Sequence, residues 1–274
     1  MQLGIFAKTF AAQGAIPVLQ AVRGAGYEVA QFNLTCLGLP AMPEDIADSV
    51  TDSIADASAR SGVAIAAVSA TYNMAHPDAA LRQAGLRRLA VMIAAAGAMG
   101  TGLVTLCTGT RDAADQWRHH PDNGSPEAWR DLAAQMEHAL TLAERHGVDL
   151  GIEPELANVV SSVPLVRRLI DEMKSTRLRV VLDPANLVEV ASDHERREIV
   201  ARAIDQLGGR IVMAHAKDRD AKGGIVAAGR GVIDFGHFAG CLRRAGFAGP
   251  LVTHGLSESE APLVALYLKK VLAA

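Results

Sequence analysis

Short apolar segments alternate with longer amphipathic segments from one end of this chain to the other. The apolar segments have the length and composition of buried strands, and the amphipathic segments have the periodicity of surface helices. Each pair takes up roughly 30 residues, so eight pairs fill the 274-residue chain, as in a barrel of eight parallel strands. The sequence therefore predicts an α/β fold, a single (β/α)8 TIM barrel over residues 1–274. The predicted strands are Leu3–Ala7, Val29–Asn33, Ala64–Ser69, Leu103–Cys107, Val148–Glu153, Leu178–Asp183, Ile211–His215 and Leu251–His254.

Glycines mark the ends of several predicted helices. Gly26, Gly62, Gly100, Gly147 and Gly246 each follow a helix-like segment, where a left-handed residue commonly ends a helix. The competing architecture is an open, doubly wound sheet, which usually has a glycine-rich phosphate loop between a strand and a helix. The GRGVIDFG stretch lacks that pattern, which favours the barrel. The predicted helices are Ala15–Ala25, Glu44–Ser61, Ala79–Ala98, Pro126–His146, Pro164–Lys174, Asp193–Leu207, Phe235–Ala245 and Glu260–Leu272.

The composition restricts the class of protein and its partners. Half of the residues are hydrophobic (50%) and 21% are charged, which is ordinary for a globular enzyme. The formal net charge of −3 gives no basic footprint for nucleic acid. Cys36, Cys107 and Cys241 are far apart and lack CxxC spacing, which is typical of reduced thiols. We find no signal peptide and no membrane span, and we therefore expect a cytoplasmic protein with neither a nucleic-acid nor a membrane partner.

The fifth to eighth predicted strands each end in a side chain that can bind a metal ion. The motifs are GIEPE with Glu153, RVVLDPAN with Asp183, RIVMAHAKD with His215 and PLVTHG with His254. The C-terminal ends of parallel barrel strands face one shared cavity, where such enzymes carry out their chemistry. Two carboxylates and two imidazoles that converge there suit a divalent metal ion. Each residue alone has an ordinary structural explanation, but their equivalent positions in four consecutive units favour a metal site.

Two further side chains share a strand face with these ligands. Residues i and i+2 of a strand point to the same side, so Glu155 accompanies Glu153, and Lys217 accompanies His215. Two polar residues at a strand end are costly in a dry core but natural at the wet mouth of a barrel. We therefore expect Glu155 and Lys217 to belong to the catalytic site together with Glu153.

Loops after the third, fourth and seventh predicted strands carry candidate substrate-binding residues. The segment ATYNMAHPD contributes Asn73 and His76, and TGTRDAADQWRHHPDN contributes Trp117, whose indole ring can stack on a sugar. Arg230 lies in a glycine-rich segment after the seventh strand, where it can contact an anionic or hydroxylated substrate. The alternative interpretations are a hydrophobic plug for Trp117 and a solvated loop side chain for Arg230.

Together these motifs resemble the xylose isomerase-like TIM barrel superfamily, which contains sugar isomerases and epimerases and the AP endonuclease type 2 barrels. The resemblance covers essentially the whole chain. It rests on EPE at Glu153, DPAN at Asp183, HAKD at His215 and GxGxxDF at Gly229–Phe235. In the ketose 3-epimerases of this kind, Glu, Asp, His and Glu hold a divalent ion, and both glutamates act as acid and base. The resemblance implies Mn²⁺ as cofactor, with Mg²⁺, Co²⁺ or Zn²⁺ as alternatives, and a homo-oligomer.

Two positions depart from the epimerase pattern. His254 stands where the epimerases have their second glutamate, and Asn186 stands where a histidine often follows the strand-six aspartate. The change at His254 removes one acid/base carboxylate, so inversion at a carbon needs a substitute among Glu155, Lys217 and His76. We include Asn186 among the substrate-binding candidates because of its position in the motif.

These residues fit an enzyme that abstracts a proton next to the carbonyl of a sugar or keto-sugar, through a metal-stabilised enediolate. Glu153 is expected to move the proton, and Lys217 to stabilise negative charge or fix the ligands. Isomerisation or epimerisation is the first hypothesis, and a metal-dependent lyase or dehydratase, which needs only one base, is the second. A phosphodiesterase like the AP endonucleases is the third, although Asn186 and the acidic balance count against it. The last is a barrel that keeps the ligands only for stability.

Overall fold

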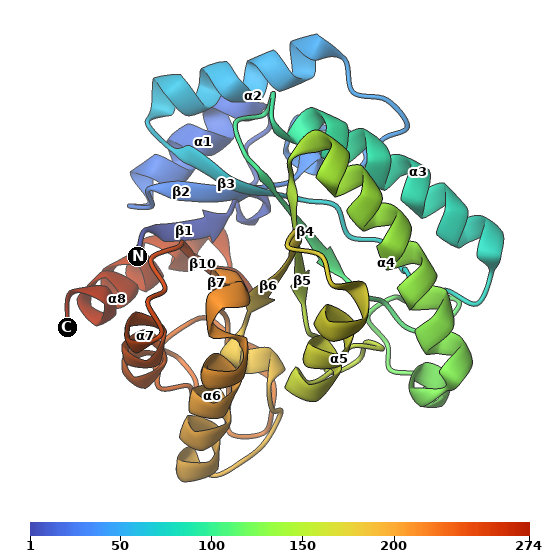
Figure 1. Cartoon of the computed structure of the whole chain (residues 1–274). Coiled ribbons are helices and arrows are strands. Elements are labelled where there is room, and N and C mark those ends of the chain that lie inside the picture. The colour runs from blue at the N-terminus through green and yellow to red at the C-terminus, as the bar shows by residue number, and fades with distance from the viewer.

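The strands of the chain close into a barrel of parallel strands with a ring of helices outside it (Figure 1). The computed structural model describes residues 1–274. The strand order around the barrel is β1–β2–β3–β4–β5–β6–β7–β10, and each neighbouring pair is parallel. Strands β8 and β9 form a separate antiparallel pair in the segment after β7. This architecture is the predicted (β/α)8 barrel.

The bounds of the elements agree with the prediction to within one or two residues, except at the start of α2. The barrel strands are β1 (Leu3–Phe6), β2 (Val29–Phe32), β3 (Ala64–Ser69), β4 (Leu103–Cys107), β5 (Asp149–Glu153), β6 (Leu178–Leu182), β7 (Ile211–Ala216) and β10 (Leu251–Thr253), and the outer pair is β8 (Asp218–Arg219) and β9 (Ile225–Val226). The helices are α1 (Ala15–Gly24), α2 (Asp48–Ser61), α3 (Ala79–Ala96), α4 (Pro126–His146), α5 (Val163–Met173), α6 (Asp193–Leu207), α7 (Phe235–Arg244) and α8 (Ala261–Ala273).

Helix α2 begins at Asp48 rather than at the predicted Glu44. Residues 44–47 lie outside the helix, and two of their side chains contact other parts of the chain. Ile46 packs against the main hydrophobic core. The Glu44 carboxylate binds the Arg88 guanidinium of α3, with 2.7 Å between Oε1 and Nε. These two contacts hold the segment along the body of the barrel.

The inner faces of the strands divide into an apolar base and a polar upper layer. A buried cluster of five apolar side chains fills the base: Ala67, Leu103, Val181, Met213 and Val252. The residues two positions further along the same strands are polar: Ser69, Thr105, Asp183, His215 and His254. Side chains two apart in a strand share a face. The strands that pack the base therefore also direct the polar side chains into the mouth of the barrel.

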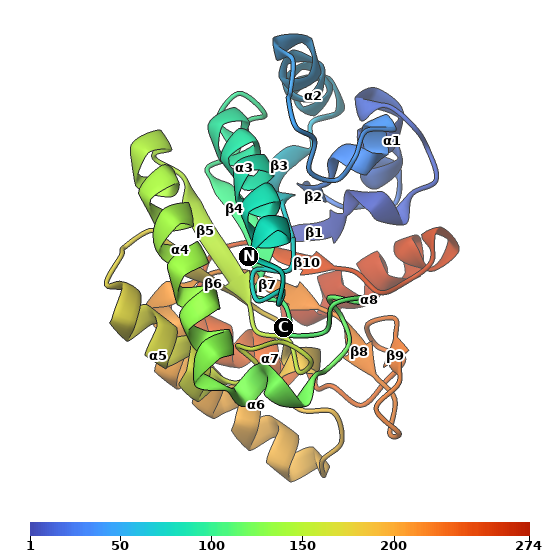
Figure 2. The ribbon, with the colours of Figure 1, turned by 90° about the vertical axis from the view of Figure 1, so that its right-hand side faces the viewer.

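A larger core lies between the barrel and its helices and comprises 65 buried residues. Figure 2 shows α3 and α4 packed side by side on the outside of the barrel. Gly62 and Gly147 end α2 and α4 with φ angles of 67° and 68°, the left-handed conformation predicted for them. None of the helices combines the length and the apolarity that crossing a membrane requires.

Candidate active site

A cavity of about 570 Å³ opens at the C-terminal ends of the barrel strands. One wall carries the titratable side chains Glu153, Glu155, His215 and His254 from the second half of the chain. The other wall carries neutral hydrogen-bonding groups from the first half, namely Gln31, Asn33, Ser69, Thr71 and Thr105. The cavity thus combines candidate metal ligands with polar groups that suit a hydroxylated molecule.

The four predicted ligands meet at one point. One ligand atom from each of Glu153, Asp183, His215 and His254 lies within 4.8 Å of the others. Nδ1 of His215 is 3.1 Å from Oε1 of Glu153, and Nε2 of His254 is 3.1 Å from Oδ2 of Asp183. The two imidazole rings pack edge to face, with 4.6 Å between their centroids. His254 therefore points into the site, as the prediction requires, and the four side chains form a compact donor set.

Neighbouring side chains shift the pKa of each group in this set. Burial alone raises the pKa of Glu153, but His215 outweighs it and brings the pKa below its ordinary value. Burial likewise opposes ionisation of Asp183, yet Lys217 and His254 hold the pKa of that carboxyl well below its usual range. Burial and the nearby His215 lower the pKa of His254, so this imidazole stays neutral. Burial lowers the pKa of His215, but the Glu153 carboxylate outweighs it and raises that pKa, so protons compete with a metal ion at this imidazole. Two ionised carboxylates and the neutral His254 imidazole are the forms that bind a metal ion.

Lys217 and Glu155 lie beside the ligands. Nζ of Lys217 is 3.6 Å from Oδ2 of Asp183 and 3.8 Å from Oε1 of Glu155. Burial, followed by the neighbouring Glu153 carboxylate, raises the pKa of Glu155 to about 7. The site therefore holds a second carboxyl group, outside the set of four ligands, that lines the cavity.

Asn186 lies on the short 3₁₀ turn that follows Asp183 and is almost fully buried. Its Nδ2 donates a hydrogen bond to Oε1 of Glu153 at 2.9 Å, while its Oδ1 has no partner. Asn186 is absent from the cavity wall. The structure therefore places this predicted substrate-binding residue behind Glu153, where it orients the carboxylate.

Trp117 lines the central cavity as predicted, and 52% of its surface is exposed. Asn73 and His76 do not reach that cavity. Oδ1 of Asn73 accepts from the backbone of Ala75 and Thr110, and both ring nitrogens of His76 bind backbone groups. The ring of His76 fastens the loops together, and His76 lines, with Asn73 and Trp117, a hollow beside the central cavity rather than the central cavity itself.

Arg230 also lies outside the central cavity. It lines a neighbouring hollow that shares Gly255 and Leu256 with the cavity wall. The structure therefore does not bring Arg230 together with the ligand cluster in one cavity.

Several cavity residues were not predicted from the sequence. Gln31 and Lys8 come from the first two barrel units, and Thr105 and Cys107 come from β4. Cys107 forms a second close group with Glu153 and Glu155. Burial raises the pKa of the Cys107 thiol well above its ordinary value, so it stays protonated. A polar residue inside an apolar strand, as in VAQF, was the available signal for Gln31.

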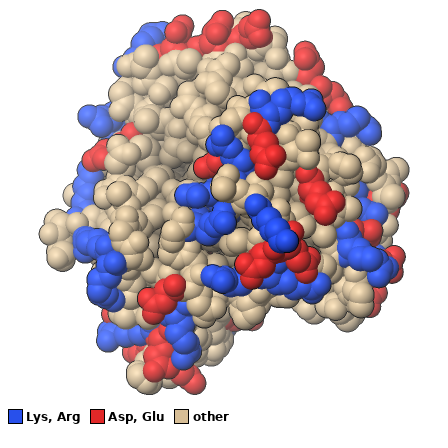
Figure 3. Space-filling view, in the orientation of Figure 1, with Lys and Arg blue, Asp and Glu red and all other residues tan.

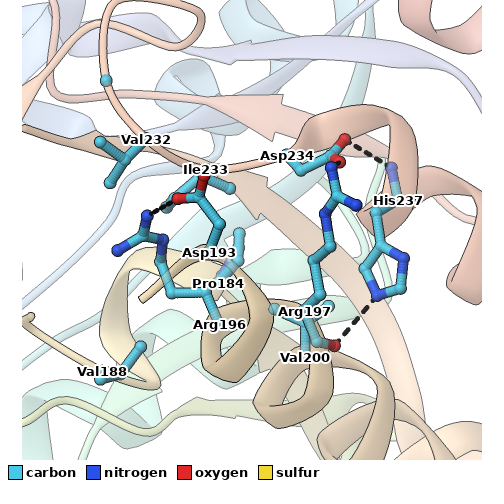
Figure 4. Close-up of a pocket in the computed structure, with 11 residues that line it drawn as sticks. Pro184, Val188, Asp193, Arg196, Arg197, Val200, Val232, Ile233, Asp234 and His237 are labelled. Carbon is cyan, nitrogen blue, oxygen red and sulfur yellow. Dashed lines mark hydrogen bonds and ion pairs between the residues drawn. The ribbon is translucent and has the colours of Figure 1, made fainter. Parts of the chain in front are cut away.

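A second cavity, of about 410 Å³, lies outside the barrel between α6 and α7 (Figure 4). Its charged side chains are paired with one another. The Arg197 guanidinium is 2.7 Å from the Asp234 carboxylate, Arg196 binds Asp193, and Nε2 of His237 lies 3.0 Å from the backbone oxygen of Arg197. We therefore assign the chemistry to the central cavity, where titratable groups face open space.

A sequence model of the xylose isomerase-like TIM barrel family matches residues 19–268, which include all four ligands. The chain belongs to this family. No curated protein sequence matches it.

Solved structures of the family have the same fold. The apo form of the 3-keto-D-glucoside 4-epimerase YcjR from E. coli is 14% identical over 100% of both chains, with a TM-score of 0.78. An L-ribulose 3-epimerase is 19% identical, with 99% of this chain and 94% of that chain covered and a TM-score of 0.77. The IOLI protein, whose structure contains a zinc atom, is 16% identical over 100% and 98% of the two chains, with a TM-score of 0.75. These similarities establish the fold, and sugar epimerases are among the structural neighbours.

Proposed function

We propose that this protein is a divalent-metal-dependent isomerase or epimerase of a sugar or keto-sugar. The observation that carries the proposal is the convergence of Glu153, Asp183, His215 and His254 at the base of an open, polar cavity. The sugar epimerases among the similar structures support a carbohydrate as the substrate class.

The four side chains suit a divalent ion. Two carboxylate oxygens and two imidazole nitrogens are compatible with Mn²⁺, Co²⁺ or Zn²⁺, and a site richer in oxygen would favour Mg²⁺. We propose Mn²⁺ as the native ion and Glu153, Asp183, His215 and His254 as its ligands. When bound, the ion would polarise a substrate carbonyl and hold the adjacent oxygen.

Glu153 is proposed to move the proton. Asn186 and His215 both bind Oε1 of this carboxylate, which leaves Oε2 without a hydrogen bond from the protein. An anchored carboxylate with one free oxygen is suited to accept a proton from a carbon next to a carbonyl.

Glu155 and Lys217 are proposed to take over the acid/base role of the glutamate that the epimerase pattern has at the position of His254. Glu155 is a second carboxyl on the cavity wall, and we propose that it returns a proton to the substrate. The Lys217 ammonium lies between Glu155 and Asp183 and offsets their negative charge. Trp117 is proposed to stack on the sugar at the mouth of the cavity.

Elimination by a lyase or dehydratase is the second candidate. The observation that favours it is His254 itself, because an imidazole that holds a metal ion does not accept a second proton. Elimination begins with the same proton abstraction as isomerisation but ends with the loss of water.

A phosphodiesterase is less well supported. On the face shown in Figure 3, basic and acidic side chains lie interspersed, so this face offers no continuous basic strip for a DNA backbone. A gel assay for cleavage at abasic sites tests this function directly.

Proton exchange tests the main proposal. The protein is incubated with Mn²⁺ and a panel of sugars and keto-sugars in deuterated water, and the substrate is followed by NMR. We expect deuterium at the carbon next to the carbonyl of at least one substrate, and retention or loss of water then separates the isomerase from the lyase. Metal-free protein is the control. Absence of exchange with every substrate, in protein that has bound one equivalent of metal, would contradict the proposal.

A further inference from the structure

Gln31 reaches from β2 to a metal ligand on β7, two strands that do not touch in the barrel. Its Oε1 lies 2.8 Å from Nε2 of His215, and its Nε2 donates a hydrogen bond to Oγ1 of Thr105 at 2.9 Å. All three residues are buried, with 4% or less of their surface exposed. A polar side chain in an otherwise apolar strand must find partners of this kind, because an unsatisfied buried amide is destabilising.

The two ring nitrogens of His215 have different surroundings. Nδ1 faces Glu153 and the ligand cluster, whereas Nε2 faces Gln31. A metal ion binds the nitrogen that carries a lone pair, so coordination through Nδ1 requires the proton to reside on Nε2. An acceptor opposite Nε2 selects that tautomer and also fixes the plane of the ring.

We propose that Gln31, held by Thr105, is a positioning residue that keeps His215 in its Nε2–H form with Nδ1 directed at the metal. The inference rests on the metal-dependent function proposed above. The orientation of the Gln31 amide is decisive. If the amide turned by half a rotation, its NH₂ group would face Nε2 and favour the Nδ1–H tautomer, which does not bind metal through Nδ1.

Both ends of the Gln31 amide are bonded to other side chains of the protein, so its positioning role is distinct from substrate binding. Although Gln31 lines the cavity, the oxygen of its amide is used by His215 and the nitrogen donates to Thr105. Ser69, on the neighbouring strand, lines the same wall but belongs to no such network. Ser69→Ala is therefore a matched control for a change in cavity polarity near Gln31.

Zinc affinity, measured by isothermal titration calorimetry, tests the inference without reference to any substrate. Gln31→Met keeps the length of the side chain but removes the acceptor, and we expect it to weaken zinc binding by about 10- to 100-fold. Gln31→Glu retains an acceptor and should bind zinc close to the wild-type level, as should Ser69→Ala. Unchanged zinc affinity in a folded Gln31→Met variant would overturn the inference.

The tautomer provides a second readout. In zinc-loaded protein labelled with ¹⁵N-histidine, we expect a protected Nε2–H signal for His215 in the wild type and in Gln31→Glu. The signal should broaden or exchange rapidly in Gln31→Met. If Gln31→Met does not fold, Thr105→Val serves instead, because it frees the Gln31 amide while conserving the shape of the side chain. A loss of affinity of about threefold or more supports the inference, and wild-type affinity in Thr105→Val contradicts it.

Failure of this inference is distinguishable from failure of the proposed function. If the wild-type protein binds no zinc, manganese or cobalt, the proposed metal-dependent function is wrong. The proposed role of Gln31 is then wrong as well. If the wild type binds zinc and Gln31→Met binds it equally well, only the role of Gln31 is lost.

Discussion

At the scale of single residues, Glu153 has the most demanding role, because it is proposed both to hold the metal and to move a proton. Glu153→Gln keeps an oxygen for the metal but removes the proton acceptor. We expect turnover to fall by about 10²- to 10⁴-fold, the usual effect of losing a general base. Steady-state kinetics and metal content must be measured on the same sample. A variant that retains its metal and exchanges the substrate proton at the wild-type rate would show that Glu153 is a ligand only.

Trp117 is the predicted aromatic residue that does line the cavity, and half of its surface is exposed. Trp117→Ala is expected to raise KM by up to about tenfold, since one aromatic contact contributes roughly 1 kcal/mol. Metal affinity and Tm should stay close to the wild-type values. A marked drop in Tm with an unchanged KM would instead identify Trp117 as a hydrophobic plug. His76→Ala is a useful comparison, because His76 fastens loops and should affect Tm rather than KM.

At the scale of elements, the GxGxxDF motif forms a brace for the segment between β7 and α7. The buried Asp218 carboxylate accepts hydrogen bonds from the backbone N–H groups of Arg219, Gly229, Gly231 and Ile233 at 2.9–3.0 Å. A Cβ atom at Gly231 would lie 2.0 Å from the backbone oxygen of Arg219, so only glycine fits there. The motif thus holds this segment in place and lines the outer cavity between α6 and α7, not the candidate active site.

Asp218→Asn tests this brace. The amide nitrogen cannot accept a hydrogen bond, so two of the backbone donors lose their partner. We expect a loss of stability of about 1–3 kcal/mol, seen as a lower Tm, because buried donors are left unsatisfied. Hydrogen exchange should accelerate in residues 219–233 and not in the barrel strands. Wild-type exchange rates in that segment would contradict the account of the motif.

The sequence predicted the elements and the convergence of four side chains well because both follow short-range rules. Strand length, helical periodicity and the position of a ligand at a strand end are local properties, and Glu153, Asp183, His215 and His254 all meet as expected. Gln31 was missed because its partner His215 is 184 positions away. The direction of the His76 ring could not be predicted, because a loop histidine offers no local sign of whether its ring points to a cavity or to backbone.

At the scale of the whole molecule, metal binding should stabilise the barrel by joining four strands at their ends. Ligand at 100 times its Kd adds about 2.7 kcal/mol, which corresponds to a rise in Tm of roughly 5 °C for a chain of this size. His254→Ala should reduce this rise, and calorimetry with and without Mn²⁺ measures it. An equal rise in the variant would show that His254 does not bind the metal.

The homo-oligomer implied by the family resemblance remains a prediction, which sedimentation velocity checks.

The metal-induced rise in Tm should also depend on pH. Protons compete with the metal for the imidazole of His215, whose pKa burial lowers but the Glu153 carboxylate raises above its ordinary value. The rise should therefore be fully present above that raised pKa and shrink as the pH falls through it, whereas His254, with its lowered pKa, competes only at lower pH. Calorimetry between pH 5 and pH 8, with metal-free protein at each pH as the control, measures the effect. A constant rise across this range would argue against histidine ligands.

Four strand ends are proposed to form one metal centre. Anomalous diffraction at the manganese edge, from crystals soaked in Mn²⁺, locates such a centre. We expect one strong peak about 2.0–2.3 Å from ligand atoms of Glu153, Asp183, His215 and His254. A peak elsewhere, or a peak at this cluster from which the His254 side chain has turned away, would contradict this proposal.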